Sequence, residues 1–182
     1  MELLFEEKPL AFQSLTFQVG STQACHKDGS YVVVDRPLEF AASWVALEDV
    51  KVGSGELEYY PKSHRFKDED FGEGRMHWNP QLDGNEVHDK FLSDIHKKAA
   101  AEGITIEKFR PKKGTALIWH PGLAHGGSQI VDQNSTRRSH VTHYCPISNI
   151  PYYFKFAPDH SSVSNSILGS YSSWFYKLEH DL

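Results

Sequence analysis

Short runs of alternating apolar and polar residues recur along most of the chain, separated by glycine, proline and acidic residues. A period of two, together with many β-branched and aromatic residues, is typical of strands that bury one face. Because short turn segments separate the runs, we expect a mostly antiparallel sheet protein. The predicted strands lie at 12–20, 30–35, 38–50, 55–61, 103–111, 114–122 and 139–146.

A helical period interrupts the strand pattern in the segment NEVHDKFLSDIHKKAAAEG. Its apolar residues recur every four positions, at Val87, Phe91, Ile95 and Ala99. Residues with this spacing lie on one face of a helix, and Gly103 after them is a common helix end. The sequence therefore predicts one amphipathic helix here.

Two segments fit neither period. The stretch 66–84 is polar and rich in Asp, Glu and Gly, and long loops in a compact domain are usually lids or binding segments. We expect this loop to close over a substrate. The residues after Pro146 hold many aromatic side chains, which we expect to cover part of the barrel or a partner subunit. They are Tyr152, Tyr153, Phe154, Phe156, Tyr171, Trp174, Phe175 and Tyr176.

Many short strands with one helix leave two architectures open. One is an immunoglobulin-like sandwich, and the other is a double-stranded β-helix, the cupin-like jelly roll that closes around a cavity. The eleven histidines favour the second, because they could cluster inside such a cavity. We expect an all-β fold with one or two helices, in which residues 1–182 form a single domain.

Composition and charge exclude several classes of protein. With 39% hydrophobic and 13% aromatic residues the chain is not disordered, and a net charge of −5 without basic patches argues against a nucleic-acid partner. No apolar run approaches the roughly 20 residues of a membrane span, and the N-terminal segment is acidic where a signal peptide is basic. We therefore expect a cytoplasmic protein. Cys25 and Cys145 lack zinc or redox spacing, and Cys25 is expected to be buried.

The segment ACHKDGSY places His26 and Asp28 two positions apart. On an extended strand both side chains leave the same face and can bind one metal ion, while Lys27 points away. A solvated turn explains the same pair, since Asp-Gly-Ser is ordinary turn chemistry. A metal site needs a third ligand, which His120 or His125 could supply. Two histidines and one carboxylate on one face of an octahedral ion suit iron(II) oxygen chemistry.

A pair of arginines stands just before the last predicted strand. An arginine aimed into a cavity can hold a carboxylate with two parallel hydrogen bonds, a geometry that lysine does not match. Paired arginines at a strand entrance are more often surface charges. We expect one of Arg137 and Arg138 to bind an anion and the other to face solvent.

Four segments in order resemble the phytanoyl-CoA dioxygenase family of iron(II)- and 2-oxoglutarate-dependent oxygenases, over about residues 10 to 145. They are HKD at 26–28, SWVALEDVKVGSGELEYYPKSHR at 43–65, GTALIWHPGLAHGGS at 114–128 and RRSHVTHY at 137–144. The resemblance implies a double-stranded β-helix in which His26, Asp28 and His125 bind the iron.

The resemblance also assigns residues to 2-oxoglutarate. The arginine of the family stands seven residues before an aromatic that ends its strand, which points to Arg137 ahead of Tyr144, with Arg138 as the alternative. Trp44 stands where the family has an aromatic near the co-substrate, although a core tryptophan would also explain it.

Several positions near the expected site are less typical of the family. Lys62 replaces a glycine, so we expect a differently built turn, and the next residues His64 and Arg65 are candidates for the substrate side. Gly127 stands where the family often carries serine or threonine, with Ser128 one residue later, so a hydrogen bond to 2-oxoglutarate is lost or shifted. Relatives usually carry helices before the first strand, so we expect this chain, which is shorter at its N-terminus, to be a domain of a larger protein or a reduced member of the family.

By resemblance, the chain uses O2 and 2-oxoglutarate to hydroxylate a C–H bond of a small molecule, releasing succinate and CO2. Asp28 favours hydroxylation, because relatives that lack this carboxylate ligand can bind halide instead. Two alternatives remain: a cupin-like metal enzyme that does not use 2-oxoglutarate, and a binding module with structural histidines. The sequence leaves the substrate and the oligomeric state open.

Overall fold

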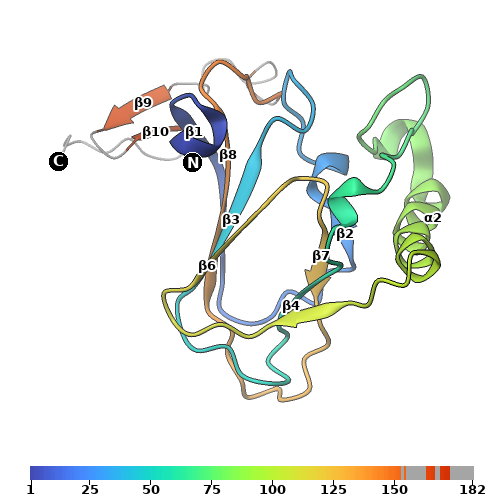
Figure 1. The fold of residues 1–182 in the computed structure, drawn as a ribbon, viewed down its shortest axis with the longest axis vertical. Coiled ribbons are helices and arrows are strands. Elements are labelled where there is room, and N and C mark those ends of the chain that lie inside the picture. The colour runs from blue at the N-terminus through green and yellow to red at the C-terminus, as the bar shows by residue number, and fades with distance from the viewer. Residues whose placement is uncertain (153, 155–162, 167–168, 173–182) are drawn as a thin grey trace.

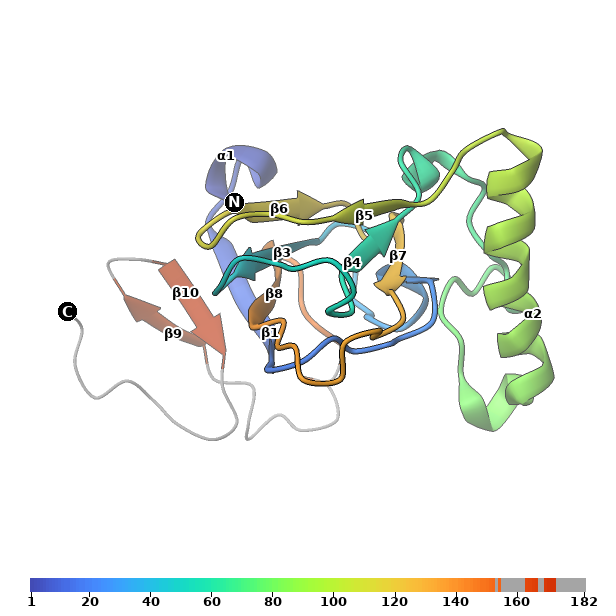
Figure 2. The same ribbon diagram turned by 90° about the horizontal axis from the view of Figure 1, so that it is seen from below.

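The computed structural model describes residues 1–152, 154, 163–166 and 169–172. Two facing β-sheets form the expected double-stranded β-helix (Figures 1 and 2). The larger sheet has the order β6 (Ala116–Trp119), β3 (Ala41–Ala46), β8 (Ser139–Pro146), β1 (Pro9–Phe17), β10 (Gly169–Ser172) and β9 (Val163–Ser166). The smaller sheet has the order β2 (His26–Lys27), β7 (Ala124–Gly127), β4 (Leu57–Tyr59) and β5 (Glu107–Phe109).

Neighbouring strands pair antiparallel, as the sequence predicts, except that β10 runs parallel to β1. The core between the two sheets is built from inward residues of both. Its buried members are Ala42, Trp44, Ala46, Val50, Leu57, Trp119 and Val141. This layer of side chains closes the barrel below the candidate site.

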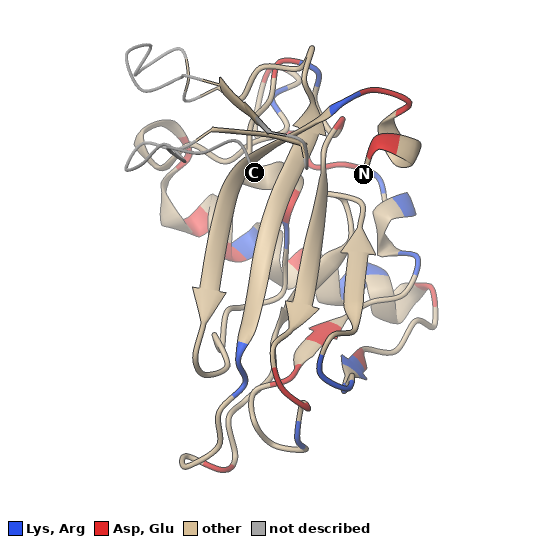
Figure 3. Cartoon of the chain, turned by 90° about the vertical axis from the view of Figure 1, so that its left-hand side faces the viewer, with Lys and Arg blue, Asp and Glu red and all other residues tan. Residues whose placement is uncertain are grey.

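The six strands of the larger sheet contain no Lys, Arg, Asp or Glu. Figure 3 shows this tan sheet with the charged residues gathered in the loops and helices around it. Outward positions hold polar residues such as Ser14 and Thr16 as well as the apolar Ile118, and Thr16 Oγ1 bonds His140 Nδ1 across β1 and β8 at 2.9 Å. The charged groups relevant to function therefore come from loops and from the smaller sheet.

The amphipathic helix is present as α2 (Pro80–Ala101), interrupted by the non-helical Gly84 (φ 70°). It lies beside the smaller sheet on the side away from the larger one (Figure 2). Phe91, Ile95 and Ala99 are buried as predicted, and Phe91 and Ile95 pack with Ala124 of β7 and with Cys25, which precedes β2. Val87, which the period also places on this face, is 40% exposed. The burial of Cys25 is confirmed.

The segment predicted to be a lid packs beside α2. Its side chains Phe66 and Phe71 are buried, and Arg75 pairs with Asp83 at 2.5 Å while also donating to the Phe71 carbonyl. None of the residues 66–84 lines the cavity described below. Polarity suggested a mobile lid, but two buried phenylalanines and one ion pair anchor the segment. Closure over a substrate thus stays a prediction without support from this packing.

Residues 30–35, predicted as a strand from the run YVVV, do not form one. The 3₁₀ turn η1 (Asp28–Ser30) is followed by irregular chain, and Val34 makes a single bridge to Pro151. The turn at Asp-Gly-Ser outweighs the β-branched run, because the backbone carbonyl of Asp28 accepts from the N–H of both Tyr31 and Val32. The other predicted strands exist but are mostly shorter than the sequence indicates.

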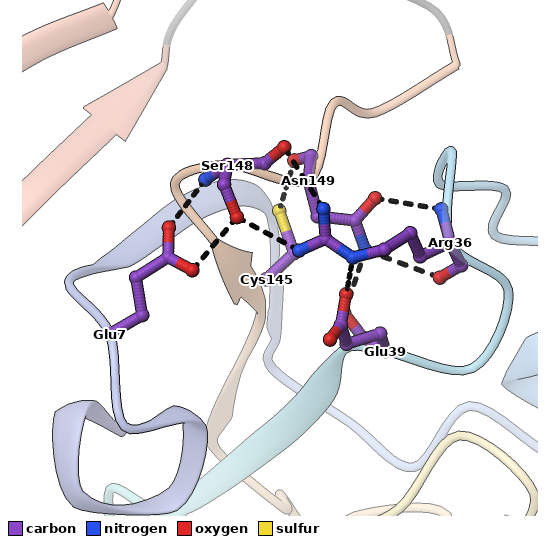
Figure 4. A network of polar contacts seen from close by, with 6 residues as sticks. All are labelled: Glu7, Arg36, Glu39, Cys145, Ser148 and Asn149. Atoms are coloured by element: carbon purple, nitrogen blue, oxygen red, sulfur yellow. Dashed lines mark hydrogen bonds and ion pairs between the residues drawn. The ribbon is translucent and has the colours of Figure 1, made fainter.

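A polar network ties the loop after β8 to an earlier part of the chain (Figure 4). The side chain of Asn149, which is fully buried, donates to the carbonyls of Arg36 and Glu39 at 3.2 and 3.0 Å. Its neighbour Ser148 donates from its N–H and its hydroxyl to the two carboxylate oxygens of Glu7, at 2.7 and 2.8 Å. Because the network satisfies the amide completely, the loop is held in one place.

Only part of the aromatic C-terminal segment is described. Tyr152 is 41% exposed, whereas Phe154 packs on the buried cluster of Leu10 and Phe40. The predicted cover thus exists at Phe154. The remaining predicted aromatics Tyr153, Phe156, Trp174, Phe175 and Tyr176 lie outside the described residues.

The described helices include none that combines the length and the apolar character needed to cross a membrane.

The short helices α1 (Glu2–Phe5) and η2 (Ser63–Arg65) complete the described elements. In η2, Lys62 precedes the first turn with a left-handed backbone (φ 67°), the region that glycine adopts most readily. Lys62 therefore adopts a glycine-like backbone, and the expectation of a differently built turn stays a prediction.

Candidate active site

Three predicted metal ligands meet inside the barrel. His26 of β2 pairs directly with His125 of β7, and Asp28 begins η1 immediately after β2. Asp28 Oδ1 lies 3.6 Å from Nε2 of each histidine. All three candidate ligand atoms are buried and lie within 4.8 Å of one another. Metal–ligand bonds of about 2.0–2.2 Å fit between groups at this spacing.

Backbone carbonyls fix the orientation of both imidazoles. His26 Nδ1 donates to the Ala24 carbonyl at 2.8 Å, and His125 Nδ1 donates to the Leu123 carbonyl at 2.9 Å. A carbonyl only accepts, so the proton of each neutral ring sits on Nδ1. The Nε2 lone pairs then face the carboxylate of Asp28, and a cation bound among these three acceptors would offset their mutual repulsion.

The second oxygen of Asp28 is held by residues that the sequence reasoning missed. Trp119 Nε1–H donates to Oδ2 at 2.8 Å, and Nε2 of His143 lies 3.4 Å from the same atom. With Oδ2 held in this way, Oδ1 of Asp28 faces Nε2 of the two histidines. The sequence does indicate that His143 points inward. It is separated from Arg137 and Val141 by even numbers of residues, and alternate residues of an extended chain share a face.

The protonation states suit metal binding. Burial lowers the pKa of His125, against the opposing effect of Asp28, so the imidazole is neutral at neutral pH. Burial alone would raise the pKa of that carboxylate, but the electrostatic interaction with His125, and then the close approach of His143 and His26, hold its pKa well below the usual range. The cluster therefore offers a neutral His125 nitrogen and an anionic Asp28 oxygen beside the imidazole of His26, and two histidines with one carboxylate are the donor set of mononuclear iron(II) oxygenases.

Arg137 is buried, with 2% of its surface exposed, and lines the same cavity. Its guanidinium lies 5.5 Å from the ring centres of both Phe17 and Trp44, and Nη1 donates to Ser139 Oγ at 3.3 Å. Nε has no hydrogen-bond partner among the described residues. Burial lowers the pKa of this group, although Glu56 opposes it. A buried guanidinium with unused donors is suited to a carboxylate.

The structure separates the two candidate arginines. Arg138 faces outward, with its side chain 56% exposed and its Nε 3.8 Å from Glu48 Oε2. Trp44 belongs to the core and also lines the cavity. The interpretation as a core tryptophan and the position beside the expected ligand are therefore compatible.

Other predicted residues lie outside the cavity. His120 and His64 are exposed, with ring centres 5.8 Å apart, and Arg65 is exposed beside them. None of the three lines the cavity. Ser128, the possible substitute for the missing hydroxyl at Gly127, is buried and donates to Glu56 Oε2 at 2.9 Å. It therefore does not reach the site.

The cavity has a volume of about 180 Å³. Exposed side chains, among them Gln13, Leu15, Gln23 and Tyr31, form its mouth. Tyr31 connects this mouth to α2, because its hydroxyl bonds His88 Nε2 at 2.7 Å. The buried part holds the three candidate ligands and Arg137, so polar groups of opposite character share one enclosed space.

Comparison with known proteins gives the same class as the fold and the donor set. The family model of phytanoyl-CoA dioxygenase (PhyH) matches residues 7–139, which include all five of the candidate site residues. The chain therefore belongs to the phytanoyl-CoA dioxygenase family. A comparison with curated protein sequences gives no match.

Solved structures share the fold. SnoK, a non-heme α-ketoglutarate-dependent carbocyclase from nogalamycin biosynthesis, is 17% identical over 80% of this chain and 54% of its own, with a TM-score of 0.58. The epimerase SnoN in complex with Fe³⁺, α-ketoglutarate and nogalamycin RO is 19% identical over 81% of this chain and 54% of its own, with a TM-score of 0.58. EctD from S. alaskensis with bound Fe is 17% identical over 81% and 48%, with a TM-score of 0.56. The chain spans about half the length of these structures.

Proposed function

We propose that this protein is an iron(II)- and 2-oxoglutarate-dependent oxygenase that hydroxylates a C–H bond of a small molecule. One observation carries the proposal. A two-histidine, one-carboxylate cluster and a buried arginine with unused donors line one cavity. Family membership supports the same conclusion.

In this proposal His26, Asp28 and His125 hold the metal on one face. Their arrangement leaves the opposite face of an octahedral ion open to other ligands. When bound there with 2-oxoglutarate and O2, iron(II) supplies the oxidant for hydroxylation, with succinate and CO2 as co-products. The carbonyl contacts of the histidines and the Trp119 contact of Asp28 keep the three donor atoms oriented before any ligand arrives.

Arg137 binds the distal carboxylate of 2-oxoglutarate and so orients its 2-oxo acid end toward the metal. Phe17 and Trp44 cover the guanidinium and exclude water from it, which strengthens the ion pair. The substrate enters through the mouth, where the exposed Gln13, Gln23 and Tyr31 are available to contact it.

An anaerobic titration of the iron(II) protein with 2-oxoglutarate tests the proposal. We expect the visible charge-transfer band of a chelated 2-oxo acid, and succinate on admission of O2. The exchange Arg137→Ala removes a charged two-hydrogen-bond contact and should weaken 2-oxoglutarate at least tenfold.

Arg138→Ala is the matched control, because the exposed side chain lies outside the cavity, and its affinity should stay within about twofold. If the parent protein gives neither band nor succinate, the oxygenase proposal fails, and a cupin-like metal enzyme or a binding module replaces it. Equal losses in both arginine variants would overturn the assignment of Arg137.

A further inference from the structure

The side chain missing at Gly127 is replaced in space by another residue. Gly127 lies two residues after His125 on β7, so any side chain there would point into the cavity as His125 does. A Cβ atom at Gly127 would lie 2.6 Å from Ser21 Oγ and 2.7 Å from the backbone nitrogen of Thr22. The hydroxyl of Ser21 therefore occupies the position from which a side chain of residue 127 would start.

Backbone contacts fix Ser21 at this place. The N–H of Gly127 donates to the Gln23 carbonyl at 2.9 Å, which holds the following residues against β7. On the other side, Gly20 packs against Gly55 so closely that a Cβ at Gly20 would lie 2.7 Å from the Gly55 Cα. The two glycines permit this approach, and Ser21 is held between both contacts.

The same segment is joined to the anion-binding arginine. The backbone N–H of Arg137 donates to the Gln18 carbonyl at 3.0 Å, three residues before Ser21. Both Ser21 and Arg137 line the cavity. One short stretch of chain therefore runs from the arginine to the face of β7 that carries His125.

The hydroxyl of Ser21 has a donor to spare. It accepts a long bond from the Gln23 N–H at 3.4 Å, and among the contacts of the described residues it donates none. Among the nearby hydroxyls, Ser128 donates to Glu56, and Ser139, which accepts from Arg137, does not line the cavity. Ser21 thus lines the cavity with a hydroxyl whose proton has no acceptor among the contacts of the described residues.

Building on the proposed function, we propose that Ser21 donates a hydrogen bond to the carboxylate that Arg137 holds, the distal carboxylate of 2-oxoglutarate. The hydroxyl comes from the chain before β2 instead of from β7, which frees Gly127 to let that chain pass close over the strand.

The test compares two ligands and two serines. Iron(II) protein is titrated without oxygen with 2-oxoglutarate and with 2-oxobutyrate, a 2-oxo acid that lacks the distal carboxylate. Ser21→Ala should weaken 2-oxoglutarate about tenfold, because a hydrogen bond to a charged group is lost, and should change 2-oxobutyrate less than twofold. Ser14→Ala, an exposed serine of β1 that does not line the cavity, should change neither.

The possible failures are distinguishable. If the parent protein binds no 2-oxoglutarate, the proposed function fails. If the parent binds it and Ser21→Ala binds it equally well, the role of Ser21 alone fails. Equal weakening of both acids would also overturn that role, because the change would then act on cavity shape and not on the distal carboxylate.

A double variant checks the geometry. In Ser21→Ala/Gly127→Ser the new side chain still meets the Thr22 nitrogen, so we expect a lower melting temperature and no recovery of 2-oxoglutarate affinity. Recovery at an unchanged melting temperature would show that the chain before β2 does not fill this space.

Discussion

The cavity has two regions of opposite electrical character, one around the three candidate metal ligands and one around Arg137. Around His26, Asp28 and His125, lone pairs converge, and no Lys or Arg of the described residues forms an ion pair with Asp28. Around Arg137 a buried cation lies between aromatic rings, and its Nε has no partner among the described residues. His143, whose Nε2 lies 3.4 Å from Asp28 Oδ2, follows Arg137 by six residues. Six residues of extended chain span roughly 20 Å.

This contrast shows which kind of ligand each region of the cavity lacks. Buried polar groups are ordinarily paired, because an unpaired one costs about 1–3 kcal/mol or more when charged. The region around the three candidate ligands lacks a cation, and the region around Arg137 lacks an anion. A metal ion bound together with a dicarboxylate that carries a 2-oxo group would supply both the cation and the anion.

The largest effect is expected from removing a metal ligand. Asp28→Ala or His125→Ala should lower iron(II) affinity by at least about 100-fold, since losing a ligand costs more than losing a residue that only orients one. Anaerobic equilibrium dialysis measures it. His120→Ala, an exposed histidine five residues before His125, should bind iron like the parent. Loss in His120→Ala with retention in His125→Ala would reverse our choice of the third ligand.

A smaller effect is expected from loosening Asp28 without removing it. Trp119→Phe keeps an aromatic ring but deletes the Nε1–H that donates to Asp28 Oδ2. Contacts of this kind typically contribute 10- to 100-fold to metal affinity, so we expect a loss of about tenfold with little change in 2-oxoglutarate affinity at saturating iron. An unchanged iron affinity would mean that the remaining contacts suffice to orient the carboxylate.

A third prediction concerns folding stability and the acidic residue behind Arg137. Glu56 is fully buried and accepts from the Gly53 N–H, Arg110 Nε and Ser128 Oγ at 3.1, 3.0 and 2.9 Å. Burial would raise its pKa, but these hydrogen bonds lower it to about 2. Glu56→Gln should therefore reduce the free energy of unfolding by about 2 kcal/mol at pH 7.

The pH dependence of that loss follows from its sign. A folded pKa below the unfolded value gives stability that is present above about pH 4.5 and disappears as the pH falls toward 2. Urea unfolding at several pH values should show the difference between parent and Glu56→Gln shrinking over this window. Glu58→Gln, a partly exposed neighbour, should stay within about 0.5 kcal/mol throughout. A pH-independent difference would contradict the buried carboxylate as its source.

Local patterns predicted much of the fold. The four-residue period located α2, and Gly103 lies just beyond its end at Ala101. Alternation located most strands. Both signals act over a few neighbouring residues, so the sequence displays them directly. The run YVVV misled because the turn at Asp28 controls the backbone there, and the loop 66–84 misled because its two buried phenylalanines are hidden among polar residues.

The site was predictable in part. The spacing of His26 and Asp28 and the family pattern around His125 located the three candidate ligands. Alternation could have separated Arg137 from Arg138 and placed His143 inward, because residues of equal parity on one strand share a face. Nothing local marks Ser21 or Trp119, whose partners lie more than 90 residues away in the chain.

By itself the sequence determined which residue types are available and which faces of the strands carry them, because those properties repeat every two or every four residues. The tertiary structure decided which distant groups meet. It set Trp119 against Asp28 and Ser21 against Gly127, and it left Nε of Arg137 without a hydrogen-bond partner among the described residues. These meetings depend on how the two sheets pack and where glycines let backbones approach, which no local period encodes.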